Sequence, residues 1–156
     1  MNQLKLGDHL KSVNSKGDVV FPPFLGWLHR DENVTTTFID ITTKTGKSLS
    51  LTPHHLLMVT ENVDKAPAMT FAHHVREGHY LWSAESGPTK VKSVASKSHV
   101  GIFAPLTSTG TFLVDDLLVS CYAHLSSHAV AHLAFLPFRT FPHILKDEVR
   151  TACFPE

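Results

Sequence analysis

The sequence has little of what defines membrane, fibrous or disulfide-stabilised proteins. Its 156 residues include only two cysteines, Cys121 and Cys153, too few for a disulfide framework. No apolar run approaches the roughly 20 residues that a membrane-spanning helix needs. The first residues also lack the apolar stretch of a secretory signal peptide, so the chain as written predicts no leader of its own.

Charge of either sign is scarce and balanced. Charged residues make up 18% of the chain, and 14 Lys and Arg offset 14 Asp and Glu. Because no net positive charge exists to attract phosphate backbones, we expect no nucleic-acid partner. The hydrophobic content of 42% is enough for one buried core and argues against disorder or a coiled coil.

Short runs rich in Val, Ile, Phe and Thr alternate with turn residues, a pattern typical of an all-β domain. We expect strands near residues 19–21, 36–42, 48–51, 56–59, 80–82, 90–99, 102–104, 111–114 and 117–119. Residues 14–18, 44–47 and 115–116 have the composition of tight turns. The sequence therefore predicts about ten short strands and no long helix.

The C-terminal part has a different character. Ser126 and Ser127 could cap a short helix over residues 128–135, which Pro137 would end. The chain has 12 histidines, and a helix would place three of them, His124, His128 and His132, on one face. A zinc site is therefore an alternative interpretation, although no HExxH or CxxC motif accompanies these residues.

The sharpest local feature is Thr52-Pro53-His54-His55, directly before an apolar run. Pro53 lacks a backbone donor and fixes its own φ, so we expect a bend that exposes polar side chains. Two interpretations of the motif stay open at this level. It is either a turn followed by a histidine with a structural hydrogen bond, or a Thr–His pair that acts on a substrate.

Seven separated segments, in order, resemble the C-terminal autoprocessing domain of Hedgehog proteins over about residues 2–140. They are Leu4–Leu10, Leu51–Leu57, Phe103–Thr107, Gly110–Thr111, Val114–Asp115, Ser120–Ala123 and Ala131–Arg139. The resemblance implies an all-β, horseshoe-like Hint (Hedgehog/intein) fold with a short C-terminal helix. It further implies a Hint domain over residues 1–137 and a tail, 138–156, where a sterol-recognition region begins.

The resemblance also implies a chemistry. In the family, a first-position Cys attacks the preceding Gly carbonyl, and the 3-hydroxyl of cholesterol then takes the acyl group from the thioester. Thr52 and His55 match the family's Thr-x-x-His, which assigns Thr52 to strain the scissile amide and His55 to protonate its nitrogen. An amide needs such help because it is a poor acyl donor, and an imidazole with a pKa near ~6.5 is suited to the proton transfer.

Three further residues are candidates through the same resemblance. Cys121 matches a late-strand cysteine near the family's active centre, and it also fits a small buried hydrophobe. His29 stands where the family has the Asp that activates the sterol hydroxyl, and a neutral imidazole can accept that proton. Asp31 is the alternative base. His29 and Asp31 also fit solvated loop residues.

The chain departs from the family at its start. The family's Cys-Phe lies roughly two dozen residues before the Leu-x-x-Gly-Asp segment, whereas Met1 lies six residues before Gly7. As written, the chain lacks that nucleophile and first strand, so we expect no self-cleavage by this polypeptide alone. Cys153-Phe154 has the same pairing, but no strand-length segment follows it, and we interpret it as chance.

These inferences together predict the autoprocessing domain of a Hedgehog-like precursor in the secretory pathway. Its partners would be its own N-terminal signalling domain and a sterol such as cholesterol, which is a second substrate, with no dissociable cofactor. The tail 138–156 would make at most weak membrane contact. A non-catalytic Hint remnant or binding module is the alternative.

Overall fold

The computed structural model describes residues 3–14 and 16–123, and within these ranges the chain is almost entirely β-structure. The elements are β1 (Ser12–Val13), β2 (Val19–Val20), β3 (Phe24–Thr43), β4 (Ser48–Leu51), β5 (His55–Thr60), β6 (Ala68–Phe71), the 3-10 helix η1 (Ala72–His74), β7 (Tyr80–Ser83), β8 (Gly87–Thr107), β9 (Thr111–Val114) and β10 (Leu117–Ala123). The all-β prediction is confirmed. The helix predicted at 128–135 and the tail 138–156 lie outside the described residues.

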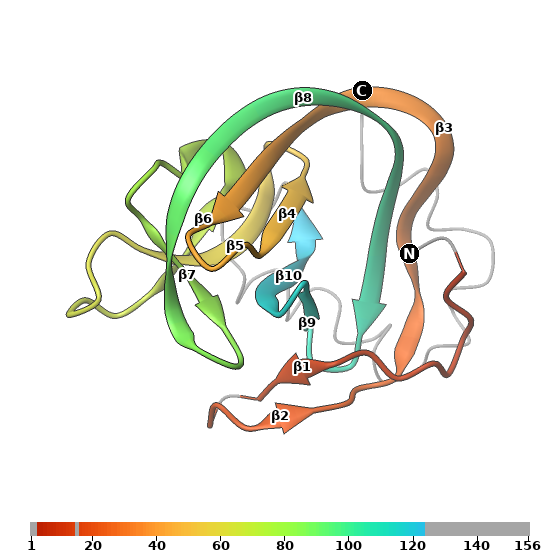
Figure 1. The fold of residues 1–156 in the computed structure, drawn as a ribbon. Helices are drawn as coiled ribbons and strands as arrows, with labels where there is room; N and C mark the ends of the chain where they lie inside the picture. Colours follow the sequence, from red (N-terminus) through yellow and green to blue (C-terminus); the bar gives the residue numbers. More distant parts are fainter. Residues whose placement is uncertain (1–2, 15, 124–156) are drawn as a thin grey trace.

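A long antiparallel ribbon of β3 and β8 arches over the other strands (Figure 1). The strands are 20 and 21 residues long. Residues 24–26 of β3 and 105–107 of β8 are buried, whereas residues 30–33 of β3 and 95–98 of β8 are exposed. The prediction of two separate strands at 90–99 and 102–104 is wrong. Gly101, with φ of +90°, lies opposite a bulge of β3, so the strand bends there and continues.

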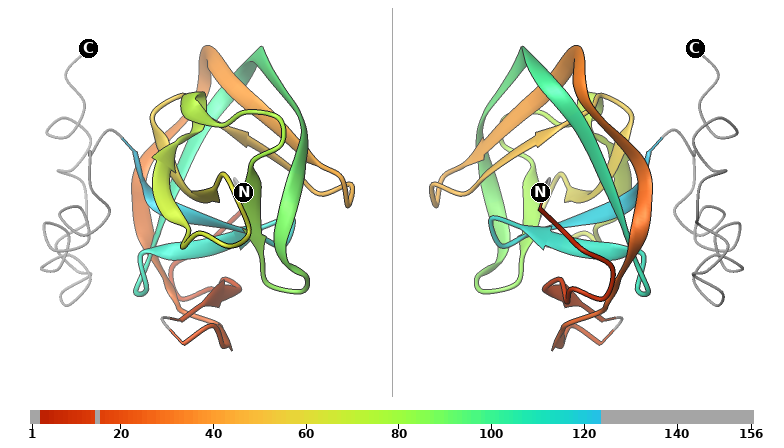
Figure 2. Two further views of the ribbon diagram at one scale, coloured as in Figure 1. Left: turned by 90° about the vertical axis from the view of Figure 1, so that its left-hand side faces the viewer. Right: turned by 90° about the vertical axis from the view of Figure 1, so that its right-hand side faces the viewer.

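The larger sheet runs in the order β4-β3-β8-β7-β10-β5-β6, and β9 pairs with β10. The turn that joins β9 to β10 is Asp115-Asp116, whose φ values of 46° and 68° suit the right-handed twist of a two-residue hairpin. The turns predicted at 14–18 and 44–47 are confirmed, with Gly17 and Gly46 at positive φ. The β1–β2 hairpin projects at one end of the molecule (Figure 2).

The core joins the two ends of the ribbon to the central strands. Its most completely buried hydrophobic residues are Ile41, Leu57, Ala72, Val75, Leu106, Leu117 and Val119. Strand β5 is buried at five of its six positions, the continuous apolar pattern of a strand covered on both faces. The residue that opens β5, His55, is therefore held by one of the most deeply buried strands of the chain.

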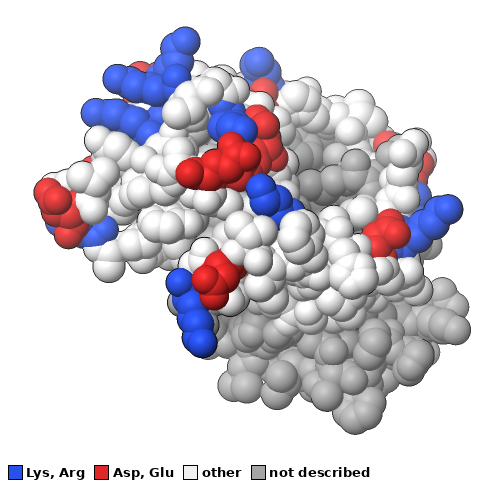
Figure 3. Space-filling view, turned by 60° about the horizontal axis from the view of Figure 1, so that its bottom comes forward, with Lys and Arg blue, Asp and Glu red and all other residues white. Residues whose placement is uncertain are grey.

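Charged side chains form local pairs of opposite sign. Figure 3 shows several acidic groups next to basic ones on one face. Ion pairs on the described surface include Arg30–Glu32, Lys47–Glu85, Lys65–Glu61 and Lys97–Asp40. Neighbouring charges of opposite sign cancel beyond a short distance. Within the ranges that the structure covers, no helix is long and apolar enough to cross a membrane.

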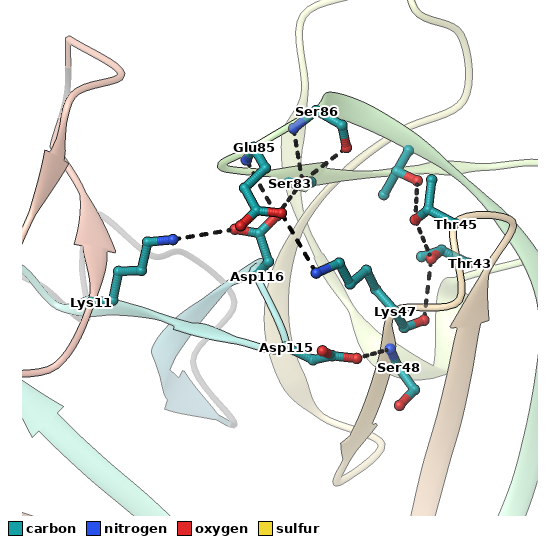
Figure 4. A network of polar contacts seen from close by, with 11 residues as sticks. Lys11, Thr43, Thr45, Lys47, Ser48, Ser83, Glu85, Ser86, Asp115 and Asp116 are labelled. Atoms are coloured by element: carbon teal, nitrogen blue, oxygen red, sulfur yellow. Dashed lines mark hydrogen bonds and ion pairs between the residues drawn. The ribbon is translucent and has the colours of Figure 1, made fainter.

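A polar network around Asp116 ties the β9–β10 turn to its surroundings (Figure 4). The Asp116 carboxylate accepts hydrogen bonds from the Ser83 hydroxyl and from the Glu85 N–H at 3.2 Å, and it lies 3.7 Å from Lys11 Nζ. Burial opposes ionisation, but the hydrogen bonds from Ser83 and Glu85 and the nearby lysines hold the pKa of Asp116 below its usual value.

Replacing Asp116 with asparagine should lower the free energy of unfolding at pH 7 by about 1–3 kcal/mol, because buried donors lose a charged acceptor. The folded-state pKa lies below the unfolded one, so the ionised group stabilises the fold above pH ~4, and this stabilisation disappears as the pH falls through the folded value. The difference in the free energy of unfolding between the parent and Asp116→Asn, measured by urea titration, should therefore be smaller at pH 3 than at pH 7. A difference of the same size at both pH values would contradict this role.

Candidate active site

The Thr52–His55 segment forms a four-residue turn between β4 and β5. The His55 N–H donates to the Thr52 carbonyl at 3.0 Å, with Pro53 at the second position that tight turns favour. Thr52 is half-buried, His54 is exposed and His55 is buried. The bend expected from Pro53 is present, but of the three polar side chains that it was expected to expose only His54 is exposed. The bend places Thr52 and His55 at the two ends of one hydrogen-bonded turn, and the exposed His54 between them lies against the rings of Phe71 and His73.

The His55 ring is fixed by a backbone acceptor from β10. Its Nε2 lies 2.8 Å from the Ser120 carbonyl oxygen, and the side chain is buried. A carbonyl oxygen can only accept, so Nε2 carries the hydrogen and the neutral ring has its lone pair on Nδ1. The contact thus fixes both the orientation and the tautomer of His55.

An irregularity in β10 lies at the Ser120 carbonyl that contacts the His55 ring. The paired residues Leu57 and His55 are two apart on β5, whereas their partners Val119 and Ala123 are four apart on β10. The extra residues of β10 form a bulge, and bulges of this kind redirect individual groups. The Ser120 hydroxyl accepts from the Tyr122 N–H at 3.0 Å and stabilises the bulge, while the Ser120 carbonyl faces the His55 ring.

Cys121 follows Ser120 and is 1% exposed. Its Sγ lies 3.5 Å from the Thr107 hydroxyl, which in turn is 2.8 Å from the Thr111 carbonyl. Because the carbonyl requires a donor, the Thr107 hydrogen points toward Thr111, and the Thr107 oxygen can accept from the Cys121 thiol. The Cys121 thiol is therefore buried and within hydrogen-bond distance of Thr107, one residue from the carbonyl that contacts His55.

His29 and Asp31 lie farther along the ribbon. His29 is half-buried opposite Ala104, whereas Asp31 is exposed opposite Ile102. At about 3.3 Å per residue, these partners are roughly 10 Å and 16 Å along β8 from Thr107, the residue beside Cys121. The Asp31 Oδ1 also accepts two local backbone N–H groups, at 2.9 and 3.2 Å. The structure therefore joins Thr52 to His55 through one turn and His55 to Ser120, the neighbour of Cys121.

The sequence did not predict the contacts that Ser120 and Thr107 make in the candidate site. Ser120 acts through its backbone carbonyl, which every residue type possesses, so no residue pattern could reveal it. Thr107 contacts Cys121 across 14 positions of sequence. Within 3–14 and 16–123, no three His, Cys, Asp or Glu side chains could hold a metal ion; the proposed zinc ligands His124, His128 and His132 lie outside these ranges.

The family of the chain follows from a direct comparison. Residues 1–152 match the family model described as the Hint module. The chain belongs to the Hint family. The resemblance to Hedgehog proteins is confirmed as well, since an Indian hedgehog protein of Gallus gallus is 35% identical over 150 residues, which are 91% of this chain and 37% of that protein. A hedgehog protein of Drosophila virilis is 34% identical over 161 residues, 97% of this chain and 33% of that protein.

The Hint module thus spans about a third of the length of the curated relatives that it matches. Solved structures confirm the Hint fold. An intein precursor, KlbA from Methanococcus jannaschii, aligns with a TM-score of 0.64 at 19% identity, covering 77% of this chain and 67% of that one. The gp41-1 intein aligns with a TM-score of 0.61 at 15% identity, covering 76% and 84%. At such identities the likeness concerns the fold.

Proposed function

We propose that this Hint module activates a peptide bond at its own N-terminal boundary for an N-to-S acyl shift. A Cys thiol supplied by the segment before the module attacks the preceding carbonyl carbon, the C–N bond breaks, and the nitrogen takes up a proton. A thioester and a free amine result. The observation that carries the proposal is the 2.8 Å contact of His55 Nε2 with the Ser120 carbonyl, which fixes the ring of His55. A short turn joins His55 to Thr52.

His55 is assigned to protonate the departing nitrogen. Because Nε2 donates to Ser120, the proton exchanged with the amide is the one on Nδ1 of the imidazolium. Thr52 is assigned to hold the scissile amide through its hydroxyl, since Thr52 and His55 are the two end residues of one hydrogen-bonded turn. Cys121 is a buried thiol, so we assign it a place in the wall of the site and not the role of nucleophile.

The second step of the proposal is transfer of the acyl group to a sterol. The similarity to Hedgehog proteins supports a precursor of the secretory pathway in which a fused N-terminal signalling domain is the acyl half. A sterol hydroxyl attacks the thioester, its proton goes to a base, and the thiolate leaves. We favour His29 over Asp31 as the base, because the Asp31 carboxylate already accepts two backbone N–H groups.

Neither step requires a dissociable cofactor. The boundaries 1–137 and 138–156 stay a prediction.

The test fuses a reporter ending in Gly, followed by a Cys-led segment, to the N-terminus of this chain. Cholesterol should release the reporter as a sterol ester, which mass spectrometry identifies. His29→Ala should slow cholesterol-dependent release by about 10²-fold, the lower end of a general base's contribution, while release by dithiothreitol stays unchanged. Asp31→Asn is the matched control and should leave both rates unchanged.

Two outcomes would count against the proposal. If the reporter is never released, the Hint module serves as a binding module in this chain. If Asp31→Asn abolishes the sterol reaction and His29→Ala does not, the assigned base is wrong.

A further inference from the structure

The turn that carries Thr52 and His55 is held by a second residue, His73 of η1. Two donors of His73 converge on one acceptor, since its backbone N–H lies 3.0 Å and its ring Nδ1 2.8 Å from the Pro53 carbonyl oxygen. A carbonyl offers no hydrogen, so His73 carries its hydrogen on Nδ1. One side chain and its own backbone therefore clamp a single peptide group of the turn.

The His73 ring is itself fixed on several sides. It stacks on Phe71, with the ring centroids 5.7 Å apart and the planes at 13°. The rings of His74 and His54 lie 4.0 and 5.1 Å from it, and Arg76 Nη1 donates to the His73 carbonyl at 2.7 Å. Half-buried and surrounded in this way, the ring loses little further freedom when it binds Pro53.

The clamp holds Pro53 through its carbonyl group. Pro53 lacks an N–H, so its carbonyl is its single backbone hydrogen-bonding group. Strand β6, which leads into η1, pairs with β5 through Phe71 and Leu56, so η1 is anchored to the strand that His55 begins. Ser120 thus fixes the His55 ring from β10, and His73 fixes the peptide two residues earlier from η1.

We propose that His73 is a positioning residue for the acyl shift, and that its hydrogen bonds to the Pro53 carbonyl set the placement of Thr52 and His55 relative to the scissile bond. The inference rests on the proposed function. His73 touches no reacting atom in this scheme and acts through Pro53. Its contribution is geometric, and displacements of about 1 Å at reacting groups can cost 10²-fold in rate.

The test compares three substitutions in the reporter-fused chain. Asparagine can place its amide N–H near the position of Nδ1, whereas glutamine carries the same amide one methylene farther out and leucine has no donor. His73→Leu and His73→Gln should slow dithiothreitol-induced release by about 10- to 100-fold. His73→Asn should stay within about threefold of the parent. His9→Leu, which changes an exposed histidine outside the clamp, is the control and should have no effect.

Ring ¹⁵N NMR of the unfused chain gives a readout that does not depend on cleavage. We expect an Nδ1–H tautomer for His73, and a shift of the His55 ring signals in His73→Gln that is absent in His73→Asn. If the parent releases no reporter but these NMR results hold, the proposed function fails and the clamp stands. An Nε2–H tautomer for His73, or equal rates and equal His55 signals in the Asn and Gln variants, would overturn the clamp.

Discussion

Replacing His55 with alanine should slow thiol-induced release of a fused reporter by about 10²–10⁴-fold, the usual contribution of a positioned acid or base. The departing amine is a poor leaving group without a proton, and His55 is the titratable group that the 3.0 Å turn contact holds beside Thr52. Release rates are measured by gel electrophoresis with dithiothreitol at pH 7. His54→Ala is the matched control: the adjacent ring is exposed and lies against Phe71 and His73, so its loss should slow release far less than loss of His55.

Loss of the His55 side chain also removes its hydrogen bond to Ser120, so a folding defect must be separated from a chemical one. His55→Gln keeps an amide that can donate to the Ser120 carbonyl but cannot supply a proton near neutral pH. His55→Gln should release the reporter as slowly as His55→Ala does, but it should unfold at a urea concentration closer to that of the parent. A His54→Ala variant slower than His55→Ala would show that the catalytic histidine has been misassigned.

Leu57→Ala should lower the free energy of unfolding by about 2–5 kcal/mol, the cost of a large-to-small change in a packed core. Leu57 is fully buried in β5 and pairs with Thr70 of β6 on one side and Val119 of β10 on the other. The resulting cavity would lie between strands that are fixed by the backbone ladders on both sides, so the site has little freedom to collapse.

Urea denaturation followed by tryptophan fluorescence measures this loss. Leu6→Ala removes the same atoms from a side chain that is 69% exposed, and it should change the free energy of unfolding by no more than about 0.5 kcal/mol. Equal effects of the two substitutions would mean that β5 is not at the centre of the core.

The local parts of the fold could be predicted because their signals are local. The strands at 48–51 and 111–114 have the predicted bounds, and the turns containing Gly17 and Gly46 follow from the positive φ that glycine allows. The β3–β8 ribbon could not be predicted as one element. Residues 30–33 of β3 and 95–98 of β8 are exposed in succession, so the alternation that marks a half-buried strand is lost in both stretches, and Gly101 suggests an end where the chain only bends.

In the candidate site, too, some residues could be predicted from the sequence and others could not. Thr52 and His55 were found through a short motif and a family resemblance, and the turn between them follows from Pro53. The groups that fix them, Ser120 and His73, bind through or to backbone carbonyls. The His55–Ser120 contact spans 65 positions and the His73–Pro53 contact spans 20, so both depend on strand pairings that the residue pattern does not specify.

The most direct measurement is the fate of the reporter when dithiothreitol is added to the fused chain carrying the native Thr52–His55 turn. The account predicts a reporter whose mass equals that of the Gly-terminated reporter thioester with dithiothreitol, because an exogenous thiol can displace only an acyl group already moved to sulfur. Formation of the adduct should depend on His55. An intact fusion in a folded protein, with no adduct by mass spectrometry, would contradict the claim that this turn activates a peptide bond.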